Sequence, residues 1–320
     1  MKNSIFLLLH FLLFVCTGKA QTAFRHKTLP SNISGNATIL DNPIVNGNER
    51  AIIFILPVWD PAREHSSCGN FEQNAGVKYD KATQKWAIVN QSPNVDMLPN
   101  QEFNVLVIPK ETPNCFSVVC EDANRLENRL GMTINHSASN NNPNALLLVT
   151  QNYGTTYNNN SQFVGYAKGK WLIANNNYFF PLCETEKSLM PVGAKFNVLV
   201  MQKDQVIVTG YPKASAFMHK TTHIPPATNI EYIMQHVSGF ISPENSAFNA
   251  DPNFLIFATP SSGWAQEERP AGAPIGFVAT DSPLAAVLSR SNHKWAIVNA
   301  STIPFKEGTL INVLAMKSIK

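Results

Sequence analysis

Histidines, cysteines and aromatic side chains are the residues of this chain whose chemistry could serve catalysis or binding. His26 and His219 occupy matching places in two Phe-x-His-Lys-Thr segments, where each could act as a base or a metal ligand. The corresponding segment in the middle of the chain carries Val118, which favours a structural role for both histidines. The chain has no HExxH, GxSxG, paired CxxC or phosphate-loop motif, and its metal-ligating residue types are scattered. We therefore expect no metal site, no cofactor and no catalytic residue.

Three aromatic residues are the better candidates for binding. Trp59, Tyr153 and Trp264 follow an apolar run at roughly corresponding places in three repeats, and we expect them in loops. An exposed Trp or Tyr offers a large contact area with a polar handle, which suits stacking on a sugar ring or filling a partner's pocket. Asn-rich segments beside them could donate hydrogen bonds to hydroxyl groups. The alternative is that the three rings fold back over the edge of their own unit.

Four cysteines lie beyond residue 20, namely Cys68, Cys115, Cys120 and Cys183. An even number in an exported chain favours disulfides, and four cysteines allow three connectivities. Alternating residues predict a strand through Cys115 and Cys120, which would place them roughly 16 Å apart on opposite faces. A disulfide needs Cα atoms within about 7 Å, so these two are not expected to be partners. All four remain disulfide candidates.

The N-terminus has the pattern of a secretory signal. Lys2 precedes an apolar run over residues 5–16, and Gly18-Lys19-Ala20 predicts cleavage after Ala20. The run is too short for a spanning helix, which needs about 20 apolar residues. A lipoprotein signal using Cys16 is the second interpretation, because Val15 is large for that processing. The sequence therefore predicts a secreted, periplasmic or surface-exposed protein.

The charge balance excludes some partners. Cleavage removes two of the 25 basic residues and none of the 22 acidic ones, so the mature chain carries a net charge near +1. Charged residues make up 15% of the chain, below the roughly 25% of an ordinary soluble protein. No basic footprint for nucleic acid or an anionic membrane is present, and we expect neither partner.

The elements that must position these residues repeat three times along the chain. The most regular segment reads KWAIVN at 85–90 and 294–299 and KWLIAN at 170–175. An apolar run precedes it in each copy, and a segment with Asn-Val-Leu follows it. Between run and KW segment we expect a short apolar stretch with a glycine, at AGVKY (75–79), VGYAK (164–168) and IGFVA (275–279). The repeats predict a signal segment at 1–20 and units at 21–110, 111–213 and 214–320.

The apolar runs IIFIL, LLLV and FLIF have no polar position, which is typical of strands covered on both faces. The sequence therefore predicts an all-β protein of three tandem β-sandwich-like or barrel-like repeat units. We expect six residues in the cores, namely Trp86, Trp171, Trp295, Phe103, Phe196 and Ile311. Asn100, Gly193 and Gly308 stand three residues before the closing strand of each unit, where a left-handed turn is expected.

The repeat resembles a tandem module of uncharacterised secreted bacterial proteins. That module combines an aromatic-x-His strand, Asn-Pro-Asn-Ala before an aliphatic run, Trp-x-Ile-x-Asn and Gly-x-x-Phe-Asn-Val, and its motifs cover nearly all of the mature chain. Val118 and Ile311 depart from the pattern. The resemblance implies fold and export, and it implies no activity.

From these observations we expect a non-catalytic binding or adhesion protein, whose ligand is a polysaccharide or a component of the extracellular matrix. The alternative is a structural or assembly protein of the cell envelope. A hydrolase with residues that the sequence does not reveal comes third.

Overall fold

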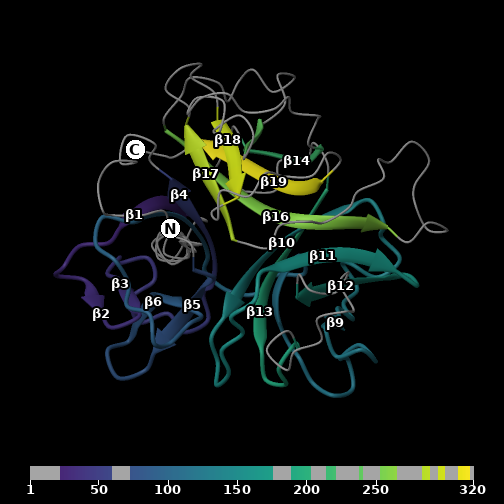
Figure 1. Ribbon diagram of the computed structural model, residues 1–320, viewed down its shortest axis with the longest axis horizontal. Coiled ribbons are helices and arrows are strands. Elements are labelled where there is room, and N and C mark those ends of the chain that lie inside the picture. The colour runs from purple at the N-terminus through teal and green to yellow at the C-terminus, as the bar shows by residue number, and fades with distance from the viewer. Residues whose placement is uncertain are drawn as a thin grey trace, which may run out of the picture.

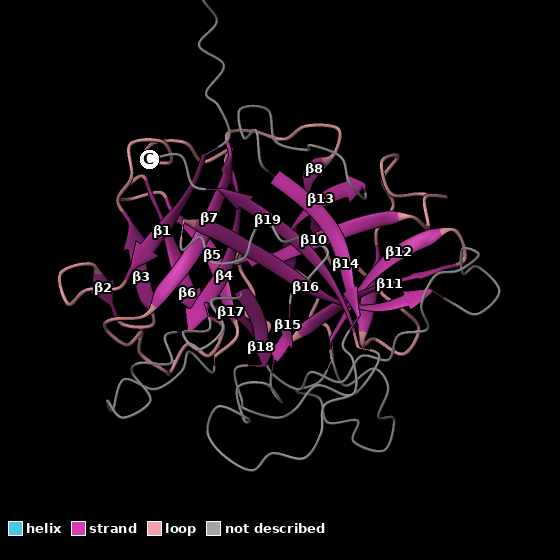
Figure 2. Cartoon of the chain, turned by 90° about the horizontal axis from the view of Figure 1, so that it is seen from above, coloured by secondary structure: helices cyan, strands magenta, loops and turns pink. Residues whose placement is uncertain are grey.

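The computed structural model describes residues 22–59, 73–175, 189–202, 214–220, 238–240, 253–264, 283–288, 295–299 and 309–317. Strands and connecting turns make up these residues, and no helix occurs among them (Figure 2). The protein is all-β, as predicted. The predicted signal segment at 1–20 lies outside the described residues.

The strands fall into three groups along the chain, for which we keep the names unit 1, unit 2 and unit 3. Unit 1 has β1 (Thr22–Lys27), β2 (Ile33–Ser34), β3 (Ala37–Leu40), β4 (Ile52–Trp59), β5 (Ala75–Asp80), β6 (Lys85–Asn90) and β7 (Glu102–Ile108). Unit 2 has β8 (Cys115–Val119), β9 (Gly131–Thr133), β10 (Ala145–Asn152), β11 (Gln162–Ala167), β12 (Lys170–Asn175) and β13 (Lys195–Gln202). Unit 3 has β14 (Ala214–Lys220), β15 (Ser238–Phe240), β16 (Phe254–Trp264), β17 (Leu284–Leu288), β18 (Trp295–Asn299) and β19 (Leu310–Lys317).

Each of the three sheets is built from two units. Their strand orders are β1-β7-β4-β17-β18-β15, β2-β3-β6-β5-β10-β13-β8 and β14-β19-β16-β11-β12-β9. Every unit thus keeps its opening, first apolar and closing strands together and sends its hairpin into the sheet of a neighbour. The joins are the parallel pairs β17–β4, β5–β10 and β11–β16. The three joins close a ring of units around a common centre, with β10 and β16 near its middle (Figure 1).

The ring explains why the runs IIFIL in β4, LLLV in β10 and FLIF in β16 have no polar position. In β4 and β7, Ile53 and Phe103 face the core of unit 1, while Phe54 and Leu106 face a second core at the centre. Strands β10 and β13 of unit 2 alternate in the same way, with Leu147 on one side and Leu148 in the central core. Both faces of these strands are therefore buried, and a period-2 pattern has no polar side to show.

Three buried asparagines cross-link the units at the centre. The side-chain amide of Asn104 in unit 1 donates to the carbonyl of Ile256 in unit 3 at 2.9 Å. The equivalent amides of Asn197 and Asn312 donate to the carbonyls of Ile53 at 2.9 Å and Leu147 at 3.1 Å. Each bond joins the closing strand of one unit (β7, β13 or β19) to the first apolar strand of another unit (β16, β4 or β10). We call these three residues the asparagine ring.

The structure buries all six residues that we expected in the cores, which are Trp86, Trp171, Trp295, Phe103, Phe196 and Ile311. Trp86 and Trp171 have the same surroundings. The indole N–H of each donates to a turn carbonyl, that of Asn48 at 2.8 Å and that of Asn142 at 2.9 Å. A tyrosine ring of the paired strand packs edge-on against each indole.

The expected glycine stretch is wrong in its alignment. The residues that face the three tryptophans across their hairpins are Tyr79, Tyr166 and Leu288. Gly76 precedes Tyr79 by three residues and Gly165 precedes Tyr166 by one, so these glycines are not equivalent. In unit 3 the hairpin strand is β17 (Leu284–Leu288), and residues 275–279 lie outside the described residues. The pairing with Trp across the hairpin, and not the glycine, defines the position.

The turn before the closing strand is left-handed wherever it is described. Asn100 has φ 65° and Gly193 has φ 87°, which are values that Asn and Gly adopt most readily. Gly308 lies outside the described residues.

Cys115 and Cys120 are free, buried thiols. Cys115 lies in the central core and Cys120 in the core of unit 2, so the strand does place them on opposite faces. Burial raises the pKa of Cys115, and it raises the pKa of Cys120 to about 11. The structure thus joins neither in a disulfide, and Cys68 and Cys183 lie outside the described residues.

The two matching histidines are equivalent in the structure to Val118. His26, Val118 and His219 pair with Phe103, Phe196 and Ile311 at the same place in three sheets. Burial lowers the pKa of His26 and of His219 to about 4. The Nε2 atom of His26 lies 2.8 Å from the hydroxyl of Thr38. Both side chains are therefore neutral at neutral pH.

We expect the protein to lose stability as the pH falls from about 6.5 towards 4. In that window the unfolded chain binds protons on both histidines while the folded chain does not, so acid favours unfolding. Replacing both residues by the valine that unit 2 uses, as His26→Val with His219→Val, should remove this part of the pH dependence. Urea unfolding at pH 7 and pH 5 measures it. An equal loss of stability in the double variant would contradict the assignment.

Candidate functional site

The three aromatic residues proposed for binding lie at three different joins of the ring. Trp59 ends β4 and pairs with Val287, and Trp264 ends β16 and pairs with Tyr166. Tyr153 directly follows β10, and its amide donates to the carbonyl of Val77 at 2.7 Å. Each residue meets the hairpin of a different unit, so the three do not form one site.

The expectation that all three lie in loops is wrong for Trp59 and Trp264, whose backbones belong to strands. Pairing with the neighbouring hairpin extends β4 and β16 to these residues. Their side chains lie outside the described part of the chain. Tyr153 is the one of the three whose surroundings the structure describes.

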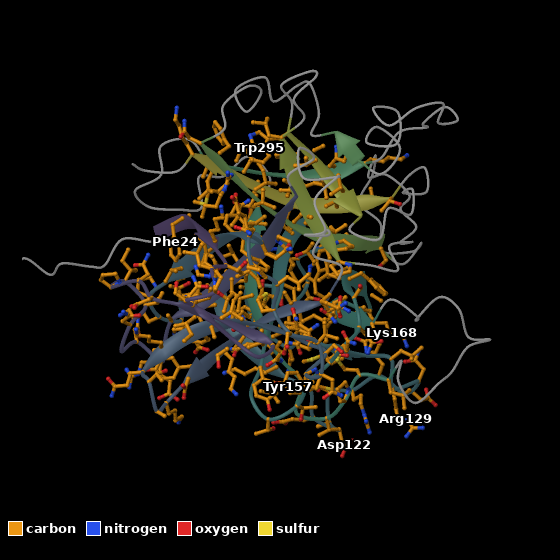
Figure 3. All side chains as sticks on the ribbon, turned by 60° about the vertical axis from the view of Figure 1, so that its left-hand side comes forward. Phe24, Asp122, Arg129, Tyr157, Lys168 and Trp295 are labelled. Carbon is orange, nitrogen blue, oxygen red and sulfur yellow. The ribbon has the colours of Figure 1, made fainter. Side chains whose placement is uncertain are left out.

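Three half-buried side chains gather around Tyr153, which is itself half-buried. Its ring centroid lies 4.3 Å from that of Tyr157, with an angle of 34° between the ring planes. The Nζ atom of Lys78 lies 4.9 Å from the centroid of Tyr153, and the Nδ2 atom of Asn36 lies 3.5 Å from the hydroxyl of Tyr157. We call Tyr153, Tyr157, Lys78 and Asn36 the tyrosine site. Figure 3 shows Tyr157 near the rim of the molecule, away from Trp295.

Two units build the tyrosine site. Lys78 lies on β5 of the unit 1 hairpin and Asn36 in the turn between β2 and β3, whereas Tyr153 and Tyr157 lie in the loop after β10 of unit 2. The parallel pairing of β5 with β10 brings Lys78 beside Tyr153. The site therefore exists only because the hairpin of unit 1 completes the sheet of unit 2.

Buried amides hold the loop that carries Tyr157. The side-chain amide of Asn158 donates to the Oδ1 atom of Asn175 at 2.9 Å, and its backbone amide donates to the Oε1 atom of Gln91 at 3.2 Å. Asn160 donates to the Oδ1 atom of Asn158 at 2.8 Å. Asn-rich segments could donate to a ligand, but the side-chain amide of Asn158 does not serve this purpose, because it is buried and bonded within the protein.

The tyrosine site holds groups of the kind that proteins use for recognition. Its two rings offer aromatic surface, and its ammonium, amide and phenol groups can donate hydrogen bonds at the rim. None of the four side chains is a nucleophile with an adjacent base. Within the described ranges, no group of three or more His, Cys, Asp or Glu side chains could hold a metal ion.

Sequence reasoning found Tyr153 and missed its three neighbours. Tyr157 lies in the segment YNNNS and Asn36 in the turn Asn-Ile-Ser-Gly-Asn, both of which are visible in the sequence as local features. Nothing in the sequence shows that these segments meet, since the meeting depends on which unit receives the hairpin.

Two stretches of the chain, residues 7–107 and 76–200, each match a family described as a domain of unknown function (DUF7452). The chain belongs to this family. The two matches overlap over residues 76–107, which hold β6 and most of β5 and β7. Comparison with curated proteins and with solved structures finds no match for the chain.

The regular elements of the described residues are all strands. These residues therefore contain no helix that is long and apolar enough to cross a membrane.

Proposed function

We propose that the protein is a secreted, non-catalytic binding protein that attaches to a polysaccharide through the tyrosine site. The observation that carries the proposal is the pair of half-buried tyrosine rings at the join of two units, with an amide and an ammonium beside them. Sugar rings present C–H faces that pack on aromatic rings and hydroxyl groups that accept or donate hydrogen bonds at their edge. The low net charge of the mature chain favours a neutral ligand.

We extend the proposal to the other two joins of the ring. Trp59 stands at the end of β4 where Tyr153 follows β10, and Trp264 takes a similar place at the end of β16. Three weak sites on one chain would bind a repeating polymer more tightly than any single site does. A matrix protein as the ligand, an envelope assembly role and a hydrolase are the other outcomes of the test below.

Replacing Tyr153 or Tyr157 by alanine should weaken binding to the preferred polysaccharide by about tenfold or more, as expected for an aromatic residue at the centre of a contact. Tyr157→Phe keeps the ring and loses only the hydroxyl, so it should retain most of the affinity. A glycan array followed by isothermal titration on the best ligand measures both effects.

Leu29→Ala is the matched control, because Leu29 is an exposed apolar residue outside the tyrosine site. It should bind like the unaltered protein. Equal affinity of all variants would refute the site, and turnover of the polysaccharide would refute the non-catalytic role.

A further inference from the structure

Hydrogen bonds from backbone amides to threonine hydroxyls link the first apolar strands of the units, β4, β10 and β16, at the centre of the ring. The amide of Ile55 in β4 donates to the hydroxyl of Thr150 in β10 at 3.2 Å. The amide of Val149 in β10 donates in the same way to the hydroxyl of Thr259 in β16 at 2.9 Å. These are two rungs of a threefold arrangement that runs from unit 1 to unit 2 and from unit 2 to unit 3.

The third rung lacks its acceptor. Ile55, Val149 and Ala258 are equivalent, because they pair with Val105, Val198 and Val313 at the same place in three closing strands. The residue equivalent to Thr150 and Thr259 in unit 1 is Leu56, which carries no oxygen. Leu56 therefore cannot accept a hydrogen bond from the amide of Ala258.

A pocket of about 90 Å³ lies at this place. Its walls include Leu56 and Ala258 of the incomplete rung, the two threonines Thr150 and Thr259, and further apolar and polar residues, among them Pro57, Pro260, Asn74, Gln151, Ser161 and Gln162. All its described lining residues are uncharged. Each threonine oxygen accepts an amide and keeps its own hydrogen for donation, so the pocket combines apolar walls with a few hydrogen-bond donors.

The chemistry of these walls selects a small neutral group that has one acceptor oxygen and one apolar end. The volume is several times the roughly 10–15 Å³ of such space that one water molecule needs, so a group of a few heavy atoms fits. An ion is disfavoured because no described charge faces the pocket. We propose that this pocket, which we call the axial pocket, binds the acetamido group of an N-acetylated sugar, with the carbonyl oxygen towards the amide of Ala258 and the methyl group against the apolar wall. This inference rests on the proposed function, since it names the class of sugar that the protein takes.

Isothermal titration with two trisaccharides of the same linkage, one of N-acetylglucosamine and one of glucose, tests the inference. The unaltered protein should prefer the acetylated sugar by about tenfold, which corresponds to one or two added hydrogen bonds. Leu56→Thr supplies the missing oxygen, occupies the amide of Ala258, and should abolish the preference. Leu56→Val introduces a side chain that has the shape of threonine but no oxygen, so this variant should keep the preference for the acetylated sugar.

Equal affinity for the two sugars in the unaltered protein, or the same preference in both Leu56 variants, would overturn the inference. If Leu56→Thr does not fold, the preference of the unaltered protein decides alone. Suppose that Tyr153→Ala loses binding to both sugars and that the unaltered protein binds the two sugars equally. This result would support the proposed function and reject the pocket. Failure of both sugars to bind the unaltered protein would reject both.

Discussion

Asn197→Ala is expected to lower the free energy of unfolding by about 3 kcal/mol, because it leaves several buried polar groups without partners. The side chain of Asn197 donates to the carbonyl of Ile53 at 2.9 Å. Its oxygen accepts from the hydroxyl of Ser117 at 3.0 Å and from the amide of Asn152 at 2.9 Å. Alanine removes all three bonds in a place that water does not reach. Urea unfolding followed by circular dichroism measures the change.

The other members of the asparagine ring are matched controls at the same position of the repeat. Asn104 and Asn312 each donate to one carbonyl, and their Oδ1 atoms have no partner in the described part of the structure. Asn104→Ala and Asn312→Ala should therefore cost less than Asn197→Ala, about 1–2 kcal/mol each. An equal cost at the three positions would show that the shared bond between units, and not the local network of unit 2, sets the energy.

The sequence predicted the parts of the fold that depend on one strand and its two faces. Runs with no polar position predicted strands buried on both sides, and the second face of β4 proves to be the central core. The place before the closing strand required a left-handed turn, and Asn100 and Gly193 have positive φ. Such features depend on the residue types within a single repeat, so the sequence of that repeat is enough to predict them.

The exchange of hairpins could not be predicted from the repeats. A strand that pairs with its own unit and a strand that pairs with the next unit have the same pattern of apolar residues. The choice is made by three-dimensional closure, through contacts such as the bond from Asn104 to Ile256, whose partners are 152 residues apart. The mistaken match of residues 275–279 has a similar cause, because a glycine in a short apolar stretch carries no information about the partner strand.

The sequence predicted one residue of the candidate site and none of the contacts between units that build it. Tyr153 follows a strand in a repeated place, so position alone indicated it. Its contacts with Tyr157, Lys78 and Asn36 arise from the pairing of β5 with β10, and no local pattern reveals that pairing.

The outer edge of β8 bears on the alternative of an assembly protein. The backbone of Cys115 exchanges hydrogen bonds with that of Thr112, and the amide of Ser117 donates to the carboxylate of Glu111 at 3.1 Å. The carbonyl of Val119 accepts from the side chain of Asn124 at 2.9 Å. Capped groups of this kind oppose pairing with the edge strand of another molecule. Assembly through the edge of β8 is therefore disfavoured.

A disulfide placed across the join that closes the ring should form and stabilise the protein by up to about 5 kcal/mol, because it would close a loop of more than 200 residues. Val58 in β4 and Ala286 in β17 are the paired residues at this join. Neighbouring strands lie about 5 Å apart, which suits a disulfide. The thiols of Cys115 and Cys120 are buried and have raised pKa values, so they should not compete for the new cysteines.

The matched control is Val58→Cys with Ala285→Cys. Ala285 is adjacent to Ala286 but lies in a different cluster of buried residues, on the other face of β17. Its thiol should point away from position 58 and remain unpaired. The control has the same number of cysteines in the same strands, so it separates register from proximity.

Three units close into a ring because each unit places its hairpin in the sheet of a neighbour, and this exchange creates the tyrosine site and the axial pocket at the joins. Peptide mapping by mass spectrometry of the oxidised Val58→Cys, Ala286→Cys protein tests this claim most directly. The closed ring predicts a near-complete 58–286 crosslink within one chain and no 58–285 crosslink in the control. Free thiols at 58 and 286 in the folded protein, or equal crosslinking in the control, would contradict it.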